Sequence, residues 1–225
     1  MKRSLVGSLE KALGPDQVCF PSDTAVFRPR DIDSLAEGMR VISAAKGKVA
    51  IAGGGAPPAP VSRGDVIGIS LARMNEVREV NSGDFIVVAG AGAIADEAVK
   101  AAREERMLVP LDITSGERAT VGGAYMTAAI GPYAAGYGPF RDYVIGAKCV
   151  TAGGDIVTFG GRTMKNVTGY EITRFLAGTR GIFAIAAELT LKALPLPERQ
   201  TVLLGKFNGF NAPWGVPPEI EKTGG

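Results

Sequence analysis

Clustered glycines are the residues whose type and spacing point most directly to chemistry. The segment VAIAGGGAPPAP at 49–60 places Gly53, Gly54, Gly55 and Ala56 directly after an apolar run. Glycine lets backbone amides approach a phosphate closely, and a run of such amides forms an anion-binding concavity. The prolines that follow have no amide to donate. The segment therefore predicts a phosphate loop whose donors are limited to the amides of residues 54–56.

A second glycine pattern, GAGAIA, imitates a dinucleotide fingerprint. Gly90, Gly92 and Ala95 fit GxGxxA between a strand and a helix, and Asp112 follows about twenty residues later. The strand before it is, however, the second half of a tight hairpin and is expected to be antiparallel, whereas the fingerprint needs a parallel βαβ unit. We therefore favour glycines that let the helix pack closely on its sheet. An NAD-binding protein is kept as an alternative.

The chain contains no histidine. This excludes histidine acid–base catalysis, histidyl metal sites and a flavin tethered through an imidazole. No other candidate general base is evident, so no catalytic residue is assigned. Cys19 and Cys149 are far apart and form no CxxC motif, which favours reduced core cysteines in a cytoplasmic protein.

Composition predicts an ordinary globular protein. The 225 residues include 25 Lys and Arg against 23 Asp and Glu, a net charge of only +2 without long runs of one sign. We therefore expect neither a nucleic acid nor a membrane surface as partner. The basic start is interrupted by Glu10 and Lys11 before a signal-peptide core can form, and no apolar stretch reaches the roughly 18 residues of a membrane span.

Hydrophobic periodicity predicts alternating helices and strands. The opening third reads as a small βαβ-like unit, and two hairpins and a long strand follow. Helices are expected at 5–13, 31–46, 94–106 and 171–177 and directly after Thr120; strands at 49–52, 66–71 and 182–194; and hairpins at 76–89 and 144–159. Residues 198–225, rich in proline and glycine, are expected to form a C-terminal extended arm.

Segments 50–58, 68–92, 109–161 and 165–198, the last with its proline-capped end, together resemble one family. It is the FAD-binding (PCMH-type) domain of the vanillyl-alcohol oxidase and p-cresol methylhydroxylase superfamily, most closely the small flavin subunits of bacterial glycolate oxidases. The resemblance implies an α+β fold of two small α/β subdomains, at about 1–75 and 76–197, with non-covalent FAD between them. It also implies a domain of residues 1–197 without the C-terminal substrate (cap) domain.

The resemblance assigns cofactor-binding residues by position. Gly53, Gly54, Gly55 and Ala56 correspond to the loop around the pyrophosphate, and Thr120, Val121, Gly122 and Gly123 to a second phosphate-side loop. Thr127 to Gly131 correspond to a segment near the flavin, and Gly181, Ile182 and the residues up to Ile185 to a stretch whose backbone meets the cofactor. Amides at the start of the helix after Thr120 would favour a diphosphate.

Other family positions have plainer interpretations. Lys165, Asn166, Gly169 and Tyr170 reproduce a family segment that either lines the flavin edge or, as we favour, caps and packs the following helix. Arg141 and Asp142 match a family Arg-Asp, for which an exposed ion pair or a turn cap is the default explanation. Arg180 and Ile182 stand where the family commonly has acidic and hydroxyl residues.

Two functions follow from the resemblance. The first is an FAD-binding subunit of a hetero-oligomeric flavin-dependent 2-hydroxyacid oxidase or dehydrogenase. Its partners would be a larger flavin subunit carrying the substrate domain and an iron-sulfur electron-transfer subunit. The second is a structural subunit of such a complex that has lost FAD, an alternative supported by Pro57 and Pro58 in the loop.

Overall fold

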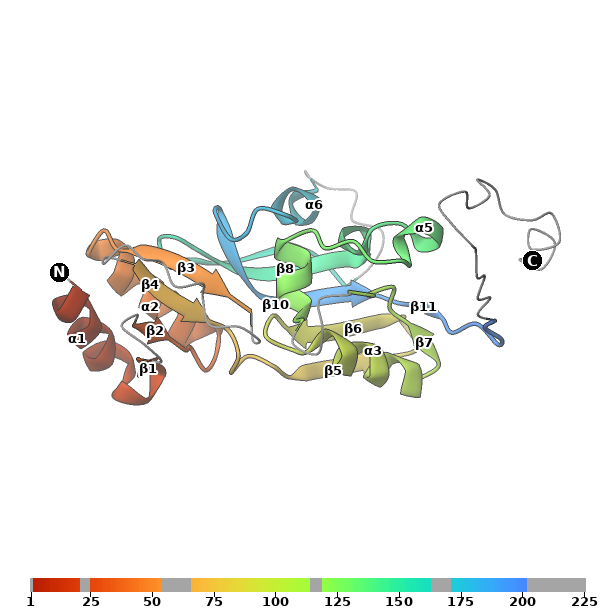
Figure 1. Cartoon of the computed structure of the whole chain (residues 1–225), viewed down its shortest axis with the longest axis horizontal. Coiled ribbons are helices and arrows are strands. Elements are labelled where there is room, and N and C mark those ends of the chain that lie inside the picture. The colour runs from red at the N-terminus through yellow and green to blue at the C-terminus, as the bar shows by residue number, and fades with distance from the viewer. Residues whose placement is uncertain (1, 21–24, 54–65, 114–118, 163–170, 202–225) are drawn as a thin grey trace, which may run out of the picture.

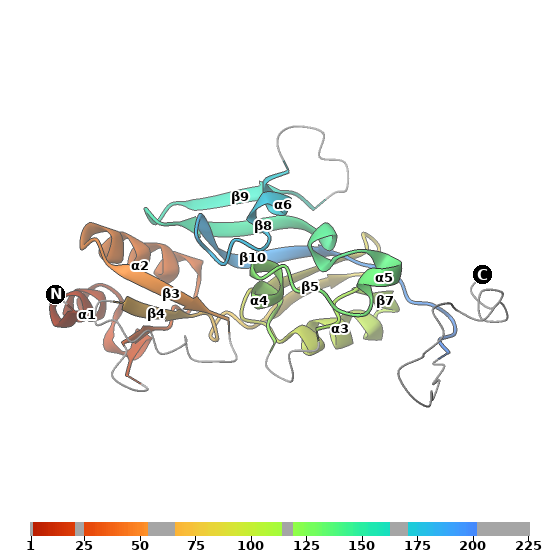
Figure 2. The same cartoon turned by 45° about the horizontal axis from the view of Figure 1, so that its top comes forward.

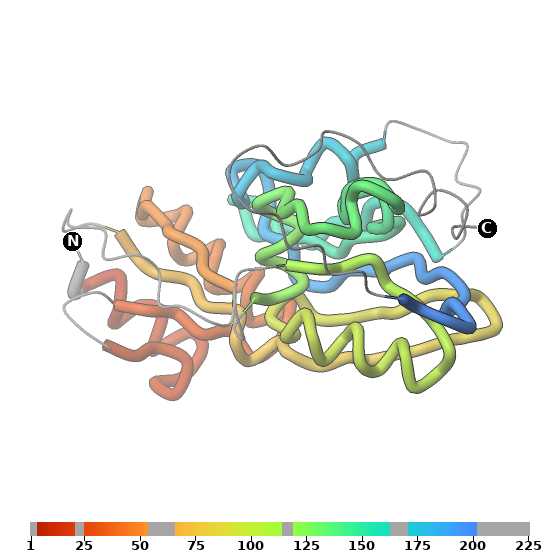
Figure 3. Tube along the Cα trace, turned by 45° about the vertical axis from the view of Figure 1, so that its right-hand side comes forward, coloured from red at the N-terminus to blue at the C-terminus, as the bar shows by residue number. Residues whose placement is uncertain are grey.

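The computed structural model describes residues 2–20, 25–53, 66–113, 119–162 and 171–201. They form an α+β fold with two main sheets that lie side by side along the long axis of the molecule (Figure 1). The smaller sheet and its helices come from the first part of the chain, and the larger sheet comes from the remainder (Figure 3). Among these residues, no helix is long and apolar enough to cross a membrane.

The smaller sheet contains the βαβ-like unit that the sequence predicts. Strands β2 and β3 both pair in parallel with β4, and helix α2 connects them. The strand order is β1-β2-β4-β3. The elements are α1 (Lys2–Leu13), the 3-10 helix η1 (Pro15–Gln17), β1 (Val18–Cys19), β2 (Val26–Phe27), α2 (Ile32–Ala44), β3 (Lys48–Ala52) and β4 (Val66–Ser70).

Leucines at helical spacing hold α1 in place, because Leu5 and Leu9 are buried in a core formed with α2 and the sheet. Leu35 and Ile42 of α2 are buried in the same core, as expected for an amphipathic helix. On α2, a Cβ atom at Gly38 would lie 2.3 Å from the ring of Phe27. A side chain at that position would therefore push the helix off the sheet.

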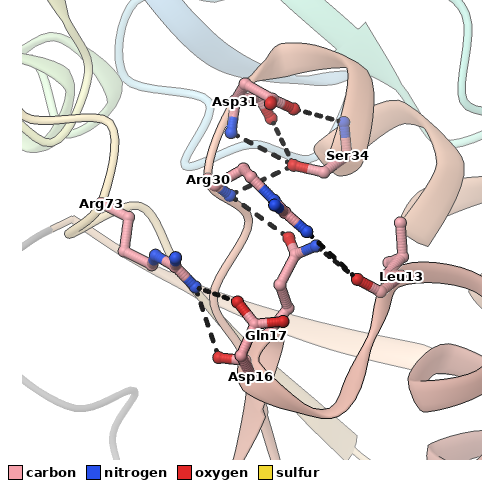
Figure 4. A network of polar contacts seen from close by, with 7 residues as sticks. All are labelled: Leu13, Asp16, Gln17, Arg30, Asp31, Ser34 and Arg73. Atoms are coloured by element: carbon pink, nitrogen blue, oxygen red, sulfur yellow. Dashed lines mark hydrogen bonds and ion pairs between the residues drawn. The ribbon is translucent and has the colours of Figure 1, made fainter.

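A polar network fastens the first helix to the following segments (Figure 4). The side chain of Gln17 is buried; its amide nitrogen donates to the carbonyl of Leu13 at 2.8 Å, and its oxygen accepts from the backbone N–H of Arg30 at 3.3 Å. Arg73, just after β4, forms an ion pair with Asp16 at 3.2 Å. The end of α1, the start of α2 and the chain leaving β4 thereby meet at one place.

The larger sheet is antiparallel throughout, with the order β5-β6-β10-β8-β9. Both predicted hairpins are present as β5–β6 and β8–β9. The elements are β5 (Val77–Asn81), β6 (Ile86–Gly90), α3 (Ala95–Glu104), β7 (Met107–Leu108), α4 (Val121–Met126), α5 (Ala134–Tyr137), the 3-10 helix η2 (Phe140–Tyr143), β8 (Val144–Thr151), β9 (Ile156–Gly160), α6 (Ile172–Leu176), β10 (Ala184–Lys192) and β11 (Leu194–Pro195).

The long strand predicted at 182–194 is shorter than expected. β10 begins only at Ala184, because Arg180 and Gly181 both have positive φ and the N–H of Ile182 donates to the carbonyl of Thr179 in a turn. After β10 the chain pairs with β7 instead, through β11.

The two cores are joined by residues of the second part of the chain. The core beneath the larger sheet includes Val87, Leu189 and Leu191. The core of the smaller sheet is built mainly from residues 5–74, and it also contains Val150, Ile185 and Ala187 from the larger sheet and Ala91 directly after β6. Strand β10 has a register irregularity between Ala186 and Glu188. It thus contributes side chains to both cores.

Candidate functional site

A cavity of about 270 Å³ lies where the smaller sheet meets α4 and β10. Figure 2 shows α4 lying over β10, close to the end of the smaller sheet. Both parts of the chain line the cavity: Ile51, Gly53, Leu71, Gly122, Gly123, Met126, Thr127, Arg180, Gly181, Ile185 and Ala186. The cavity is therefore formed between the two sheets, where the sequence places the cofactor.

Six of the predicted site residues lie together in this cavity: Gly53, Gly122, Gly123, Thr127, Gly181 and Ile185. Two of the glycines are needed for close approach. A Cβ atom at Gly53 would lie 2.2 Å from Oγ1 of Thr120, and one at Gly181, whose φ is +82°, would lie 2.3 Å from Cδ1 of Ile51. Backbone therefore forms part of the cavity wall.

The other predicted residues are placed differently. Val121 is fully buried in the core beneath the larger sheet, and Thr120 is also buried, as the cap of α4. Gly131 packs against the backbone of Asp112, and Ile182 is 77% exposed. None of these four lines the cavity. Gly54, Gly55 and Ala56, with the prolines that follow, lie outside the described residues, as do Lys165, Asn166, Gly169 and Tyr170.

The first three amides at the start of α4 have acceptors within the protein. The N–H of Val121 donates to the carbonyl of Ala93 and that of Gly122 to Ala91, each at 2.9 Å. The N–H of Gly123 donates to Oγ1 of Thr120 at 3.1 Å. The first two bonds attach α4 to the segment after β6, and the third caps the helix. Gly122 and Gly123 thus contribute shape to the cavity, and these amides are already satisfied by the protein.

The turn at residues 178–181 forms the opposite side of the cavity. Two hydrogen bonds attach it to the end of α4. The N–H of Gly178 donates to the backbone carbonyl of Tyr125 at 3.1 Å, and the N–H of Arg180 donates to the backbone carbonyl of Met126 at 2.8 Å. Arg180 has a φ of 55° and Gly181 one of 82°. The backbone N–H of Gly181 has no acceptor among the described residues. This turn therefore contributes to the cavity lining one cationic residue, Arg180, and one glycine whose N–H has no acceptor among the described residues.

The structure corrects the interpretation of GAGAIA. Strand β6 is antiparallel to both of its neighbours, as predicted, so the parallel unit of a dinucleotide fingerprint is not formed. The glycines do not serve the packing of α3. A Cβ atom at Gly90 would lie 2.2 Å from the carbonyl oxygen of Met74, and one at Gly92 would lie 1.9 Å from that of Leu71. They make room for the connection between the two sheets.

Four apolar residues of the cavity lining were not assigned from the sequence, although periodicity could have indicated two of them. Ile51 lies two residues before Gly53 on the same side of β3, and Met126 lies one helical turn after Gly122. Ala186 directly follows Ile185 on β10, so its side chain lies on the opposite face of the strand and alternation does not indicate it. Leu71 follows β4 in the connection to the second sheet, and no local pattern indicates it.

Burial raises the pKa values of two side chains near the cavity. It raises the pKa of the Tyr125 hydroxyl far above its usual value, with a smaller contribution from Cys149, and that hydroxyl donates to the carbonyl of Thr173. Burial also raises the pKa of Cys149 to about 12. Both groups are therefore neutral structural groups at physiological pH. The cavity-lining residues include no carboxylate, and the described residues contain no cluster able to hold a metal ion.

Arg141 and Asp142 form an exposed ion pair. Nε of Arg141 lies 3.9 Å from Oδ1 of Asp142, and Nε of Arg174 on α6 approaches the same oxygen at 3.2 Å. All three side chains are well exposed to solvent. We therefore assign them to an exposed ion-pair network.

Comparisons with known proteins identify the family of this chain. The FAD binding domain family matches residues 24–160. The chain is 29% identical over 192 residues to the glycolate oxidase subunit GlcD of Bacillus subtilis, covering 84% of this chain and 40% of that protein. It is 36% identical over 139 residues to D-lactate dehydrogenase of Anaerostipes hadrus, covering 61% of this chain and 29% of that protein.

A further relative and a solved structure are also similar to this chain. Glycolate oxidase subunit GlcE of Escherichia coli is 34% identical over 108 residues, covering 46% of this chain and 31% of that protein. A solved structure of alkyldihydroxyacetonephosphate synthase superposes with a TM-score of 0.74 at 19% identity, covering 88% of this chain and 41% of that one. The chain thus spans at most about two fifths of the length of these relatives. It belongs to the FAD binding domain family, in the PCMH-type form found close to glycolate oxidase, and its cofactor is FAD.

Proposed function

We propose that this chain is the FAD-binding subunit of a hetero-oligomeric flavin-dependent oxidoreductase that acts on a 2-hydroxyacid, with the substrate site on a partner. The observation that carries the proposal is the glycine-walled cavity between the two sheets, whose lining residues from Ile51 to Thr127 lie within the matched FAD binding domain. The names of the relatives support the substrate class: glycolate oxidase, D-lactate dehydrogenase and D-2-hydroxyglutarate dehydrogenase all act on 2-hydroxyacids.

The described residues fit the cofactor. Gly53 and Gly181 provide wall positions where backbone can approach a ligand, and the Gly181 amide has no described acceptor. Apolar side chains of Ile51, Leu71 and Met126 supply surface that excludes water from an aromatic ring. Bound FAD would supply the hydride acceptor, and the protein would supply its orientation and surroundings. We propose that the binding is non-covalent.

The absence of a carboxylate among the cavity-lining residues supports a partner. Oxidation of a 2-hydroxyacid needs a group that takes the hydroxyl proton while the hydride leaves the same carbon. We propose that a larger flavin subunit carries that substrate site, that an iron-sulfur subunit accepts the electrons, and that the complex works in the cytoplasm. Within this chain we propose an FAD-binding domain at 1–197, with subdomains meeting at about residue 75, and an extended arm at 198–225.

The absorbance of the purified protein tests cofactor retention. We expect a flavin spectrum, with close to one FAD released per chain on denaturation. Colourless protein that also fails to take up added FAD would instead support the structural subunit without cofactor.

Purification of the complex from its own cells tests the partnership. We expect the chain to co-purify with a second flavin subunit and an iron-sulfur protein, and the flavin of that complex to be bleached by glycolate or D-lactate. If the chain is isolated alone and its FAD is reduced by one of these acids, the substrate site is its own and the subunit proposal is wrong.

A further inference from the structure

Arg180 is the single charged side chain among the described residues that line the cavity. It is exposed, and it has no ion pair or side-chain hydrogen bond to another described residue. Arg174, six residues earlier, differs in this respect: it contacts Asp142 at 3.2 Å and Glu171 at 3.0 Å. Arg180 is therefore a cation at the cavity lining that has no counter-charge among the residues the structure describes.

The backbone holds Arg180 in an unusual conformation. Its φ of 55° lies in the left-handed region, which non-glycine residues adopt uncommonly and at some cost. The hydrogen bond from its N–H to Met126 fixes this turn to the end of α4, beside Gly123 and Thr127. The position of the Arg180 backbone, from which the side chain extends, is therefore fixed relative to the glycines that line the cavity.

The cofactor brings two negative charges on its diphosphate, and these need donors. The first three amides of α4 are occupied by Ala93, Ala91 and Thr120. A guanidinium can donate two parallel hydrogen bonds to a phosphate and remains charged at any physiological pH. Gly53, at the end of β3 where the glycine loop begins, lines the same cavity as Arg180.

We propose that Arg180 binds the diphosphate of FAD and takes over the role that the α4 amides cannot fill. This inference rests on the FAD site described above. The bond is to the phosphate oxygens, so the residue sets cofactor affinity and leaves the flavin ring to other groups. An arginine that served only to shape the turn would have no such preference among ligands.

The test is a binding titration of the apoprotein with three probes: FAD, ADP, which has the diphosphate without the flavin, and riboflavin, which has the flavin without the diphosphate. Arg180→Gln should weaken FAD and ADP about tenfold or more and leave riboflavin unchanged. It should also reduce the salt dependence of FAD binding, because a charged contact is lost. Arg180→Lys should recover part of the affinity. Arg174→Gln, the matched control, makes the same charge change outside the cavity and should bind all three probes as the wild type does.

Three outcomes would overturn the proposal. One is equal FAD affinity for wild type and Arg180→Gln, both shown to be folded by circular dichroism. The second is an equal loss of ADP and riboflavin binding, which would indicate that the turn itself has been damaged. The third is weaker riboflavin binding with unchanged ADP binding, which would place the guanidinium at the flavin ring. Wild-type protein that binds none of the probes would contradict the FAD site as well, so the two failures are distinguishable.

Discussion

At the scale of single residues, Gly92 has no room for even a methyl group, since a Cβ atom there would lie 1.9 Å from the carbonyl oxygen of Leu71. We expect Gly92→Ala to lower the free energy of unfolding by about 1–3 kcal/mol, the usual cost of overpacking. Gly7→Ala is the control: this exposed position inside α1 has nothing within 4 Å, and alanine should stabilise the helix by about 0.5–1 kcal/mol. Urea denaturation of both variants measures the difference.

The same variant separates packing from nucleotide chemistry. A Gly92→Ala protein with wild-type stability and lost NAD binding would contradict the packing role and revive the dinucleotide interpretation.

Burial distinguishes the two cysteines. Cys149 is buried and its pKa is raised to about 12, whereas Cys19 is partly exposed. Because the thiolate is the reactive form, we expect a thiol reagent at pH 8 to modify one cysteine in the native protein and both in denaturant. Cys19→Ser should abolish the native reaction. A second thiol that reacts rapidly before unfolding would show that the β8 strand opens.

Only part of the site could be predicted from residue types. Gly53 and Gly181 were predictable because a family motif marks them and because glycine suits close approach. The position of Gly122 was predictable too, but its occupied amide was not, since its acceptor on Ala91 comes from a tertiary contact. Arg180 was visible only as a departure from the family, because its place in the cavity depends on how the turn meets α4.

At the scale of elements, α2 begins with a capping box. Oδ1 of Asp31 accepts from the N–H of Ser34 at 2.7 Å, and the Ser34 hydroxyl oxygen accepts from the N–H of Asp31 at 3.1 Å (Figure 4). Burial by itself would raise the pKa of Asp31, but the hydrogen bonds from Ser34 and the positive charges of Arg30 and Arg73 together outweigh it, and the pKa lies below its usual value. The charged carboxylate therefore stabilises the folded state.

We expect Asp31→Ala to cost about 1 kcal/mol at pH 7, the typical value of an N-cap. A lowered pKa gives stability that is present above the unfolded value of about 3.9 and is lost as the pH falls through the folded one. Asp31→Asn keeps a cap but cannot titrate, so its difference from wild type should shrink between pH 7 and pH 3. Urea unfolding at several pH values measures this. A constant difference over that range would show that the ionisation of Asp31 does not contribute.

The long periodic elements were predictable, and the short ones were not. The apolar residues of α1 and α2 recur at helical spacing, and both hairpins have turn residues between alternating strands, so local sequence decides them. Strands β1, β2 and β7 have two residues each and α5 has four, too few for a period to be visible. The three short strands exist because neighbouring strands supply their hydrogen-bond partners. The start of β10 depends likewise on the turn at Arg180.

At the scale of the whole molecule, the cavity proposed to bind FAD is lined by both parts of the chain, by Gly53 on one side and Ile185 on the other. A ligand that binds there must favour the state in which the two sheets are together. FAD at 100 times its dissociation constant should therefore raise the free energy of unfolding by about 2.7 kcal/mol. Thermal unfolding with FAD, compared with thermal unfolding in buffer alone, measures the shift. Two transitions, of which one ignores FAD, would contradict this coupling.

The core of the smaller sheet, which both parts of the chain build, limits how the two parts can be recombined. Residues 1–75 lack four members of their own hydrophobic core, since Ala91, Val150, Ile185 and Ala187 arrive from the second part of the chain. Residues 1–75 and the second part of the chain therefore cannot be exchanged independently between relatives. A chimera that joins them from different relatives must bring a matching set of these four side chains. A gene split at residue 75 would yield two polypeptides that have to be made together, each of them leaving apolar surface bare until it meets the other.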